Sequence, residues 1–219
     1  MPFNLTAKHV MLDALDETAT QITHVGIHQL GTDPGMGANA AGTEATGGSP
    51  AYARQAVAWG AAATEQKSNT GALTFDVPGG TYSYFTLWNA ATGNVNNYRG
   101  YIPFGGASAL KGFFSINTTL TADQILSVGH GMANGDRVVL YSVFAETLPT
   151  GLTEGTAYFV VGAAADTFQV STTSGGAAVD ITAAGGGEGY WQRMVPETFG
   201  AQGQITAAVG ALVLDLSGV

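Results

Sequence analysis

The chain has 219 residues, of which 32 are Gly and only 11% are charged, and its formal net charge is −9. It contains no Cys, which excludes disulfides, a thiol nucleophile and a Cys-based zinc site. An acidic chain without a basic cluster repels a phosphate backbone, so we expect no nucleic-acid partner. No apolar run approaches the ~20 residues of a membrane-spanning helix, and the N-terminus lacks a signal-peptide pattern. We therefore expect neither membrane insertion nor secretion through a signal peptide.

The first 50 residues predict one short helix, one strand and one long loop. Thr6 can cap the helix, and its apolar stripe would consist of Ala7, Val10, Met11, Ala14 and Leu15. Alternation of side chains over Ile22–Leu30 favours a strand. Residues 31–50 are poor in large apolar side chains, so we expect a loop that becomes ordered on a neighbouring protein.

The stretch Leu73–Trp88 carries the clearest strand pattern of the chain. Two arms with a period of two flank Pro78-Gly79-Gly80, a sequence typical of a tight turn, and together they predict a β-hairpin. The second arm is apolar or aromatic on both faces, so we expect a central, buried strand that includes Trp88. Shorter strands are expected over Ala51–Trp59 and Tyr98–Phe104.

Between Ser108 and Met194 the pattern changes to short strands at regular spacing. The predicted strands are Arg137–Phe144, Ala157–Val161, Thr167–Val170 and Ala178–Ile181. Asn134-Gly135 predicts a type I′ turn, in which both central residues have positive φ. Short strands at this spacing favour a small closed barrel. The last segment, Gln204–Val219, contains a strand pattern that would return to the sheet of the first domain.

Four motifs stand out in the outer parts of the chain: Gly47–Arg54, Phe75–Gly79, Leu87–Gly93 and Pro196–Gln202. In these motifs the chain resembles a family of tailed-bacteriophage virion proteins that are often labelled tail fibre or minor tail protein. The resemblance covers about residues 1–106 and 195–219. In typical members, the segment that matches Phe104-Gly105-Gly106 runs almost directly into the one that matches Pro196-Glu197, whereas nearly ninety residues separate them here.

The inserted segment has a resemblance of its own, carried by Gly129–Val138, Leu148–Tyr158 and Ala165–Ser171. It is similar to a small β-barrel module that recurs in phage tail fibres and is related to a half-domain of ubiquitin-activating enzymes. We therefore expect a mainly β protein with one short N-terminal helix. A discontinuous, β-sandwich-like base domain, 1–107 and 195–219, would dock on the virion and carry an inserted β-barrel knob, 108–194.

No arrangement of polar residues in the sequence indicates catalysis. His24 and His28 would share one face of a strand, but four residues of strand separate them by roughly 13 Å, too far to bind one metal ion. His9 and His130 are also explained by hydrogen bonding or turn structure, and no Gly-x-Ser-x-Gly motif occurs. We therefore predict no enzyme activity, no metal site and no cofactor.

Tyr190 and Trp191 are the candidate contact residues. They lie between glycines and polar residues, in a composition that suits stacking on a sugar or contact with a protein. The alternative is that both rings only close the barrel where the insert rejoins the base domain.

These observations and the resemblance together favour a non-enzymatic structural protein on the exterior of a phage particle, either on the tail or on the capsid surface. A tail fibre or minor tail protein is the first alternative, and a capsid decoration protein is the second. A third hypothesis is a carbohydrate-binding module for adsorption to the host, and a fourth is an enzyme that acts on envelope polymers. The expected partners are other virion proteins, namely tail or major capsid protein, further copies of this chain, and a host surface glycan.

Overall fold

The computed structural model describes residues 11–14, 21–31, 34–35, 37–105, 110–116, 123–142 and 147–215. The chain divides into two compact units. The base unit consists of residues 1–30, 34–102 and 196–219, and the barrel unit consists of 31–33 and 103–195. Strands dominate both units and the described helix is a single turn, so the predicted fold class is confirmed.

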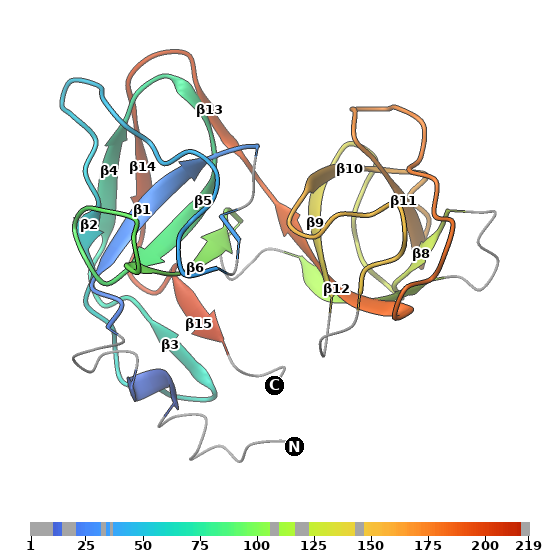
Figure 1. The fold of residues 1–219 in the computed structure, drawn as a ribbon, viewed down its shortest axis with the longest axis horizontal. Helices are drawn as coiled ribbons and strands as arrows, with labels where there is room; N and C mark the ends of the chain where they lie inside the picture. Colours follow the sequence, from blue (N-terminus) through green and yellow to red (C-terminus); the bar gives the residue numbers. More distant parts are fainter. Residues whose placement is uncertain are drawn as a thin grey trace. The chain divides into compact units, whose positions relative to one another are not determined.

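A five-stranded sheet forms the centre of the base unit, with the order β13-β5-β1-β2 and with β6 also paired to β5. Two antiparallel ribbons, β14-β4 and β15-β3, complete the unit (Figure 1). The strands of the base unit are β1 (His24–Gln29), β2 (Gln55–Ala56), β3 (Gln66–Ser68), β4 (Leu73–Val77), β5 (Gly80–Trp88), β6 (Tyr98–Pro103), β13 (Glu197–Phe199), β14 (Gly203–Ala207) and β15 (Val213–Asp215).

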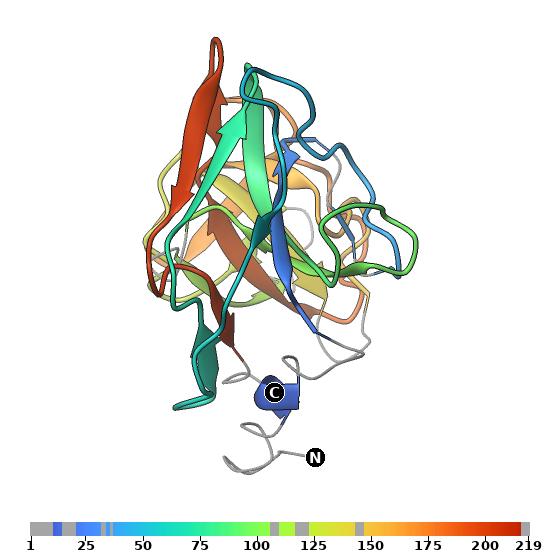
Figure 2. The same cartoon turned by 90° about the vertical axis from the view of Figure 1, so that its left-hand side faces the viewer.

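The predicted hairpin over Leu73–Trp88 is wrong, although both of its arms are strands. β4 pairs with β14, and β5 pairs with β1 and β13, so the two arms belong to different sheets. Figure 2 shows β14 beside β4. The physical reason is that β1 and β13 already occupy the edges of β5, which leaves no edge for β4. Burial of β5 is confirmed, because every side chain from Tyr82 to Trp88 is buried.

The N-terminal helical turn covers residues 11–14 and differs from the predicted stripe. Leu12 is the buried residue at 1% exposure, whereas Met11 is 43% exposed. Asp13 accepts hydrogen bonds from the Lys67 ammonium group at 2.9 Å and from the Ala62 N–H at 3.0 Å. Thr6, Ala7, Val10 and Leu15 lie outside the described residues. Within the described ranges, no helix combines the length and the apolar character that crossing a membrane requires.

The loop over residues 37–50 is held by its own unit, which corrects the expectation that it becomes ordered on a neighbour. The backbone of β1 exchanges hydrogen bonds with Thr43 and Ala45, and the Asn94 amide bonds both backbone groups of Ala40. The segment thus gains polar contacts that its composition did not reveal, in place of the apolar burial that it lacks.

Six strands of the barrel unit close in the order β10-β11-β8-β7-β12-β9, and Figure 1 views the resulting ring with β9, β10, β11, β8 and β12 labelled. The predicted small barrel is therefore confirmed. The strands are β7 (Lys111–Ile116), β8 (Ile125–Leu126), β9 (Arg137–Ser142), β10 (Ala157–Val161), β11 (Thr167–Ser171) and β12 (Glu188–Met194). The interior is filled by side chains, among them Phe114, Leu140, Tyr158, Phe168 and Trp191.

Two local predictions within the barrel unit are wrong. Residues 178–181 form no strand, although Ile181 is buried and Val179 donates a backbone hydrogen bond to Val170. In the turn at Asn134-Gly135, only Gly135 has positive φ, at 92°, so the turn is not type I′. The Asn134 side chain instead accepts a hydrogen bond from the Ala163 N–H at 2.8 Å.

Candidate functional site

An ion pair between the buried Arg54 and the partly exposed Glu44 lies in the base unit. Arg54 donates from Nε and Nη2 to the two carboxylate oxygens of Glu44, both at 2.7 Å. Its Nη1 donates to the carbonyls of Ala90 at 3.2 Å and Gly93 at 2.9 Å. The Arg54 side chain is 4% exposed and that of Glu44 is 25% exposed. Bidentate pairing fixes both side chains. The pair therefore connects three segments of the chain, which carry Glu44, Arg54 and the two carbonyls of residues 90 and 93.

Tyr52 extends this network to the backbone of the sheet. Its hydroxyl donates to Glu44 Oε1 at 2.9 Å and accepts the Ile27 N–H of β1 at 2.8 Å. Burial, and next the negative charge of Glu44, raise the pKa of Tyr52, so the hydroxyl stays protonated. A Cβ at Gly26 would come within 2.8 Å of Glu44 Oε1 and 2.9 Å of the Tyr52 hydroxyl. Glycine is therefore needed where the network meets β1.

His28 and Trp88 form the aromatic side of the network. The two rings are stacked, with centroids 6.0 Å apart, and Arg54 lies 3.4 Å from the centre of the Trp88 ring. Thr86 Oγ1 accepts from Trp88 Nε1 at 2.9 Å and lies 3.1 Å from His28 Nδ1. Burial lowers the pKa of His28 to about 4, an effect that Glu44 opposes and Arg54 reinforces. His28 is therefore neutral at pH 7.

We call this network the clamp, because its character is structural; it consists of His28, Glu44, Tyr52, Arg54, Thr86 and Trp88. Both carboxylate oxygens of Glu44 are engaged by Arg54, and His28 is 2% exposed. A general base needs access to a substrate proton, which this packing does not provide. Among the described residues, no group of three or more His, Asp or Glu side chains is arranged to hold a metal ion.

His24 and His130 lie apart from this clamp. His24 is half-buried, with Nδ1 2.9 Å from Thr23 Oγ1, and burial, followed by the charge of Arg54, lowers its pKa. His130 is buried in the barrel unit, where its Nδ1 accepts the Met132 N–H at 3.0 Å. His9 lies outside the described residues.

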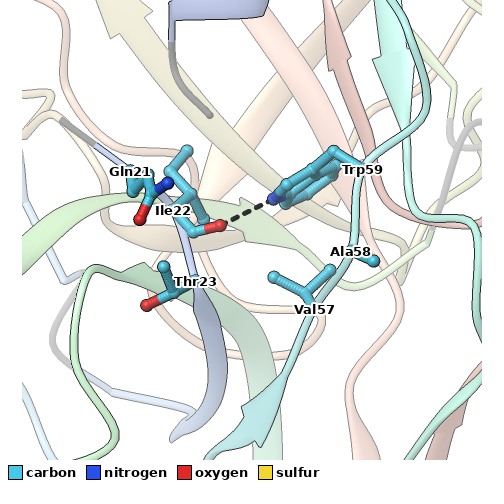
Figure 3. Close-up of a pocket in the computed structure, with 6 residues that line it drawn as sticks. All are labelled: Gln21, Ile22, Thr23, Val57, Ala58 and Trp59. Carbon is cyan, nitrogen blue, oxygen red and sulfur yellow. Dashed lines mark hydrogen bonds between the residues drawn. The ribbon is translucent and has the colours of Figure 1, made fainter. Parts of the chain in front are cut away.

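A pocket of about 250 Å³ in the base unit is lined by residues 21–23 and 57–59. Trp59 Nε1 donates to the Ile22 carbonyl at 2.8 Å across this pocket, as Figure 3 shows. The lining carries no acid, base or thiol, so the pocket has no group suited to acid–base or nucleophilic chemistry.

The structure separates the two predicted contact residues of the barrel unit. Trp191 points into the barrel, is 2% exposed and donates from Nε1 to Ser127 Oγ at 2.8 Å. Tyr190 lies on the outer wall and is half-buried. Neighbouring residues of a strand face opposite sides of a sheet, so the Trp191 ring is not presented to a partner.

Tyr190 is the middle member of a row of three aromatic residues on the outer wall, which we call the aromatic row: Phe113 on β7, Tyr190 on β12 and Tyr141 on β9. Tyr190 lies directly opposite Phe113 and Tyr141 in the strand register. The ring centroids are 5.8 Å apart for Phe113–Tyr190 and 6.4 Å apart for Tyr190–Tyr141. Phe113 is 61% exposed.

Sequence reasoning missed most of these residues. Phe113 could have been found from the alternation of Lys111, Phe113 and Ser115 along a strand, but the pairing of Tyr141 with Tyr190 depends on a register that sequence alone does not give. For the clamp, an available signal was the placement of Arg54 among apolar residues in a chain with few charges.

Comparison with known families finds a similarity over part of the chain. Residues 4–101 match the family described as "Podophage GP4 fiber I protein gp80". The match covers slightly less than half of the chain, lies almost entirely within the base unit and contains all residues of the clamp. It confirms the resemblance to a phage tail-fibre family that the sequence motifs indicated. No curated protein and no solved structure matches the chain at a significant level.

Proposed function

We propose that the chain is a virion-associated structural protein that acts without catalysis. Its base unit docks on the particle, and its barrel unit is the exposed part. The proposal starts from the similarity of residues 4–101 to a phage fibre family. The observation that carries this proposal is the division between shared and inserted sequence. The family match ends at residue 101, and the barrel unit begins at 103 apart from residues 31–33. We expect the docking surface to lie in the base unit, because this is the part of the chain that relatives share.

The two ends of the insert support this division. Val195 donates its backbone N–H to the carbonyl of Phe104 at 3.0 Å, and Arg193 donates to the carbonyl of Leu110 at 2.8 Å. The chain thus leaves and re-enters the base unit at neighbouring points. Insertions with adjacent ends are tolerated by a host domain because they leave its own contacts in place.

The test replaces residues 104–195 by a short Gly-Ser linker and measures incorporation of the shortened protein into phage particles. We expect incorporation at the level of the full chain. The matched control is Trp88→Ala in the full chain, which damages the base unit and should reduce incorporation. A shortened protein that folds, as judged by a cooperative melt, but stays out of particles would contradict docking through the base unit.

The matched family is described as a fibre protein, which favours a tail fibre or minor tail protein over a capsid decoration protein. Quantitative mass spectrometry of purified particles, with the major capsid protein as the internal standard, separates the two placements. We expect a few to some tens of copies per particle. Hundreds of copies would show decoration of the capsid.

A further inference from the structure

The aromatic row on the barrel unit is not needed to fill the barrel. The inner faces of β7 and β12 carry Phe114 and Trp191, which are 3% and 2% exposed and belong to the buried core. Glycines on these strands make room for the two rings, because a Cβ at Gly112 would lie 3.2 Å from the Trp191 ring and a Cβ at Gly189 would overlap Phe114. The outer rings are therefore additional to a complete interior.

Scattered apolar residues on a surface are normal, but adjoining aromatic rings on neighbouring strands mark contact sites. The aromatic row spans three strands, and the Phe113 and Tyr190 rings meet edge to face at an interplanar angle of 71°. Phe113 exposes more than half of its surface. The row thus offers ring surfaces to an occupant along the outer wall.

Polar side chains border the row on both sides along β7 and β12, whereas on β9 the neighbour of Tyr141 is the buried Val139. Two residues along the strands in one direction lie Lys111 and Gln192, which are opposite each other in the register, and in the other direction lie Ser115 and Glu188. Side chains two positions apart on a strand are about 7 Å apart and share a face. Hydrogen-bond donors and acceptors therefore lie within reach of any group that stacks on the rings.

We propose that the aromatic row is a binding surface for a neutral oligosaccharide. A sugar ring presents apolar C–H faces that can lie on aromatic rings, and a rim of hydroxyls that donate and accept hydrogen bonds. On β7 and β12 the apolar part is one register row wide, which suits a narrow amphipathic ligand better than a protein, whose interface needs ~800 Å² on each partner. The opposite charges of Lys111 and Glu188 leave no net charge for an ionic ligand. The inference concerns the barrel unit alone and holds wherever the base unit docks.

The experiment uses the purified full chain on an array of neutral, acidic and amine-bearing oligosaccharides, followed by calorimetric titration of the best binder. We expect binding to neutral members. Phe113→Ser and Tyr190→Ser should each weaken it by at least about tenfold, the usual effect of truncating an aromatic residue at the centre of an interface. Phe113→Tyr keeps a ring and should retain binding.

Phe159→Ser is the matched control, because Phe159 is a half-buried aromatic residue on β10 outside the row, where its ring contacts Arg137. It should leave affinity unchanged. Thermal melts of all variants separate loss of binding from loss of folding.

Three results would overturn the proposal. The first is the absence of binding by the wild type to any array member, and the second is binding that Phe113→Ser and Tyr190→Ser leave intact. The third is self-association of the wild type, seen by sedimentation and abolished by Phe113→Ser, because the row would then be occupied by a second copy of the chain.

Discussion

The guanidinium of Arg54 lies 3.4 Å from the centre of the Trp88 ring while its N–H groups bind Glu44. The Arg54 side chain thus joins the aromatic core of the base unit to the Glu44 carboxylate. Substitutions of Trp88 and of Glu44 should therefore have non-additive effects on the free energy of unfolding, and double-mutant cycles can measure that coupling.

Trp88→Ala should destabilise the base unit by about 3–5 kcal/mol, because a buried Trp leaves a large cavity. The ring is 1% exposed and contacts His28, Tyr98 and Arg54. Urea unfolding monitored by circular dichroism measures the change. Trp88→Phe retains part of the packing and should cost less. A loss below 1 kcal/mol for Trp88→Ala would contradict the central position of this ring.

Glu44→Ala should cost about 3 kcal/mol, at the lower end of the range for breaking a buried ion pair because the Glu44 side chain is 25% exposed. The variant leaves the charge of Arg54 buried without its carboxylate partner. Glu197→Ala, at an exposed position on β13, is the control and should change stability by less than about 0.5 kcal/mol. Equal effects of the two substitutions would show that the clamp adds nothing to stability.

The stability of the base unit should fall as the pH is lowered from 6.5 to 4, in part because of His28. Its pKa is about 4 in the folded state and 6.5 when unperturbed, so the unfolded state binds more protons in this window. The contribution is fully present above pH 6.5 and amounts to about 3 kcal/mol at most. Urea midpoints of the wild type and His28→Gln at several pH values isolate it. Parallel pH profiles would exclude a depressed pKa for His28.

Trp191 and its sequence neighbour Tyr190 should respond to truncation very differently. Trp191→Ala removes a core ring and a hydrogen bond to Ser127, and should cost about 3–5 kcal/mol. Tyr190→Ala removes a half-buried ring from the outer wall and should cost about 1 kcal/mol. Thermal melts of the full chain that resolve the barrel transition provide the comparison. Similar losses for both variants would contradict the assignment of inner and outer faces.

A fragment of residues 103–195 should fold on its own and melt cooperatively, because six strands close around one apolar core. A shorter fragment of residues 108–194 lacks the Val195–Phe104 backbone hydrogen bond and should melt a few degrees lower. Scanning calorimetry measures both. An unfolded 103–195 fragment would show that the barrel depends on the base unit.

The alternation of side chains within short stretches of sequence predicted the positions and the burial of individual strands. Alternation in 157–161 and 167–170 located β10 and β11, and an arm apolar on both faces identified β5 as buried. The hairpin prediction failed although its turn residues fit a tight turn. The edges of β5 are occupied by β1, more than fifty positions earlier, and by β13, more than a hundred positions later. Long-range pairing of this kind leaves no mark in a local sequence window.

The candidate sites were harder to predict than the fold. Glu44 and Arg54 lie on two segments outside the named strands, and side-chain periodicity does not predict the path of such segments. The same limit applies to the aromatic row, where each ring comes from a different strand and only the register unites them. Tyr190 was found because it stands among glycines, whereas its neighbour Trp191 shared that composition but faces inward.

The pairing of β13 with β5 and of β14 with β4 gives the order of chain synthesis a role in folding. The base unit needs residues 197–207, which leave the ribosome after the whole barrel sequence, to cover strands made at residues 73–88. All strand pairs of the barrel, in contrast, lie between residues 111 and 194. Domains fold as their sequences emerge, so the barrel is complete while β4 and part of β5 still await their partners. A nascent chain in which β12 has left the ribosome and β13 has not would therefore carry a complete barrel on an unfinished base.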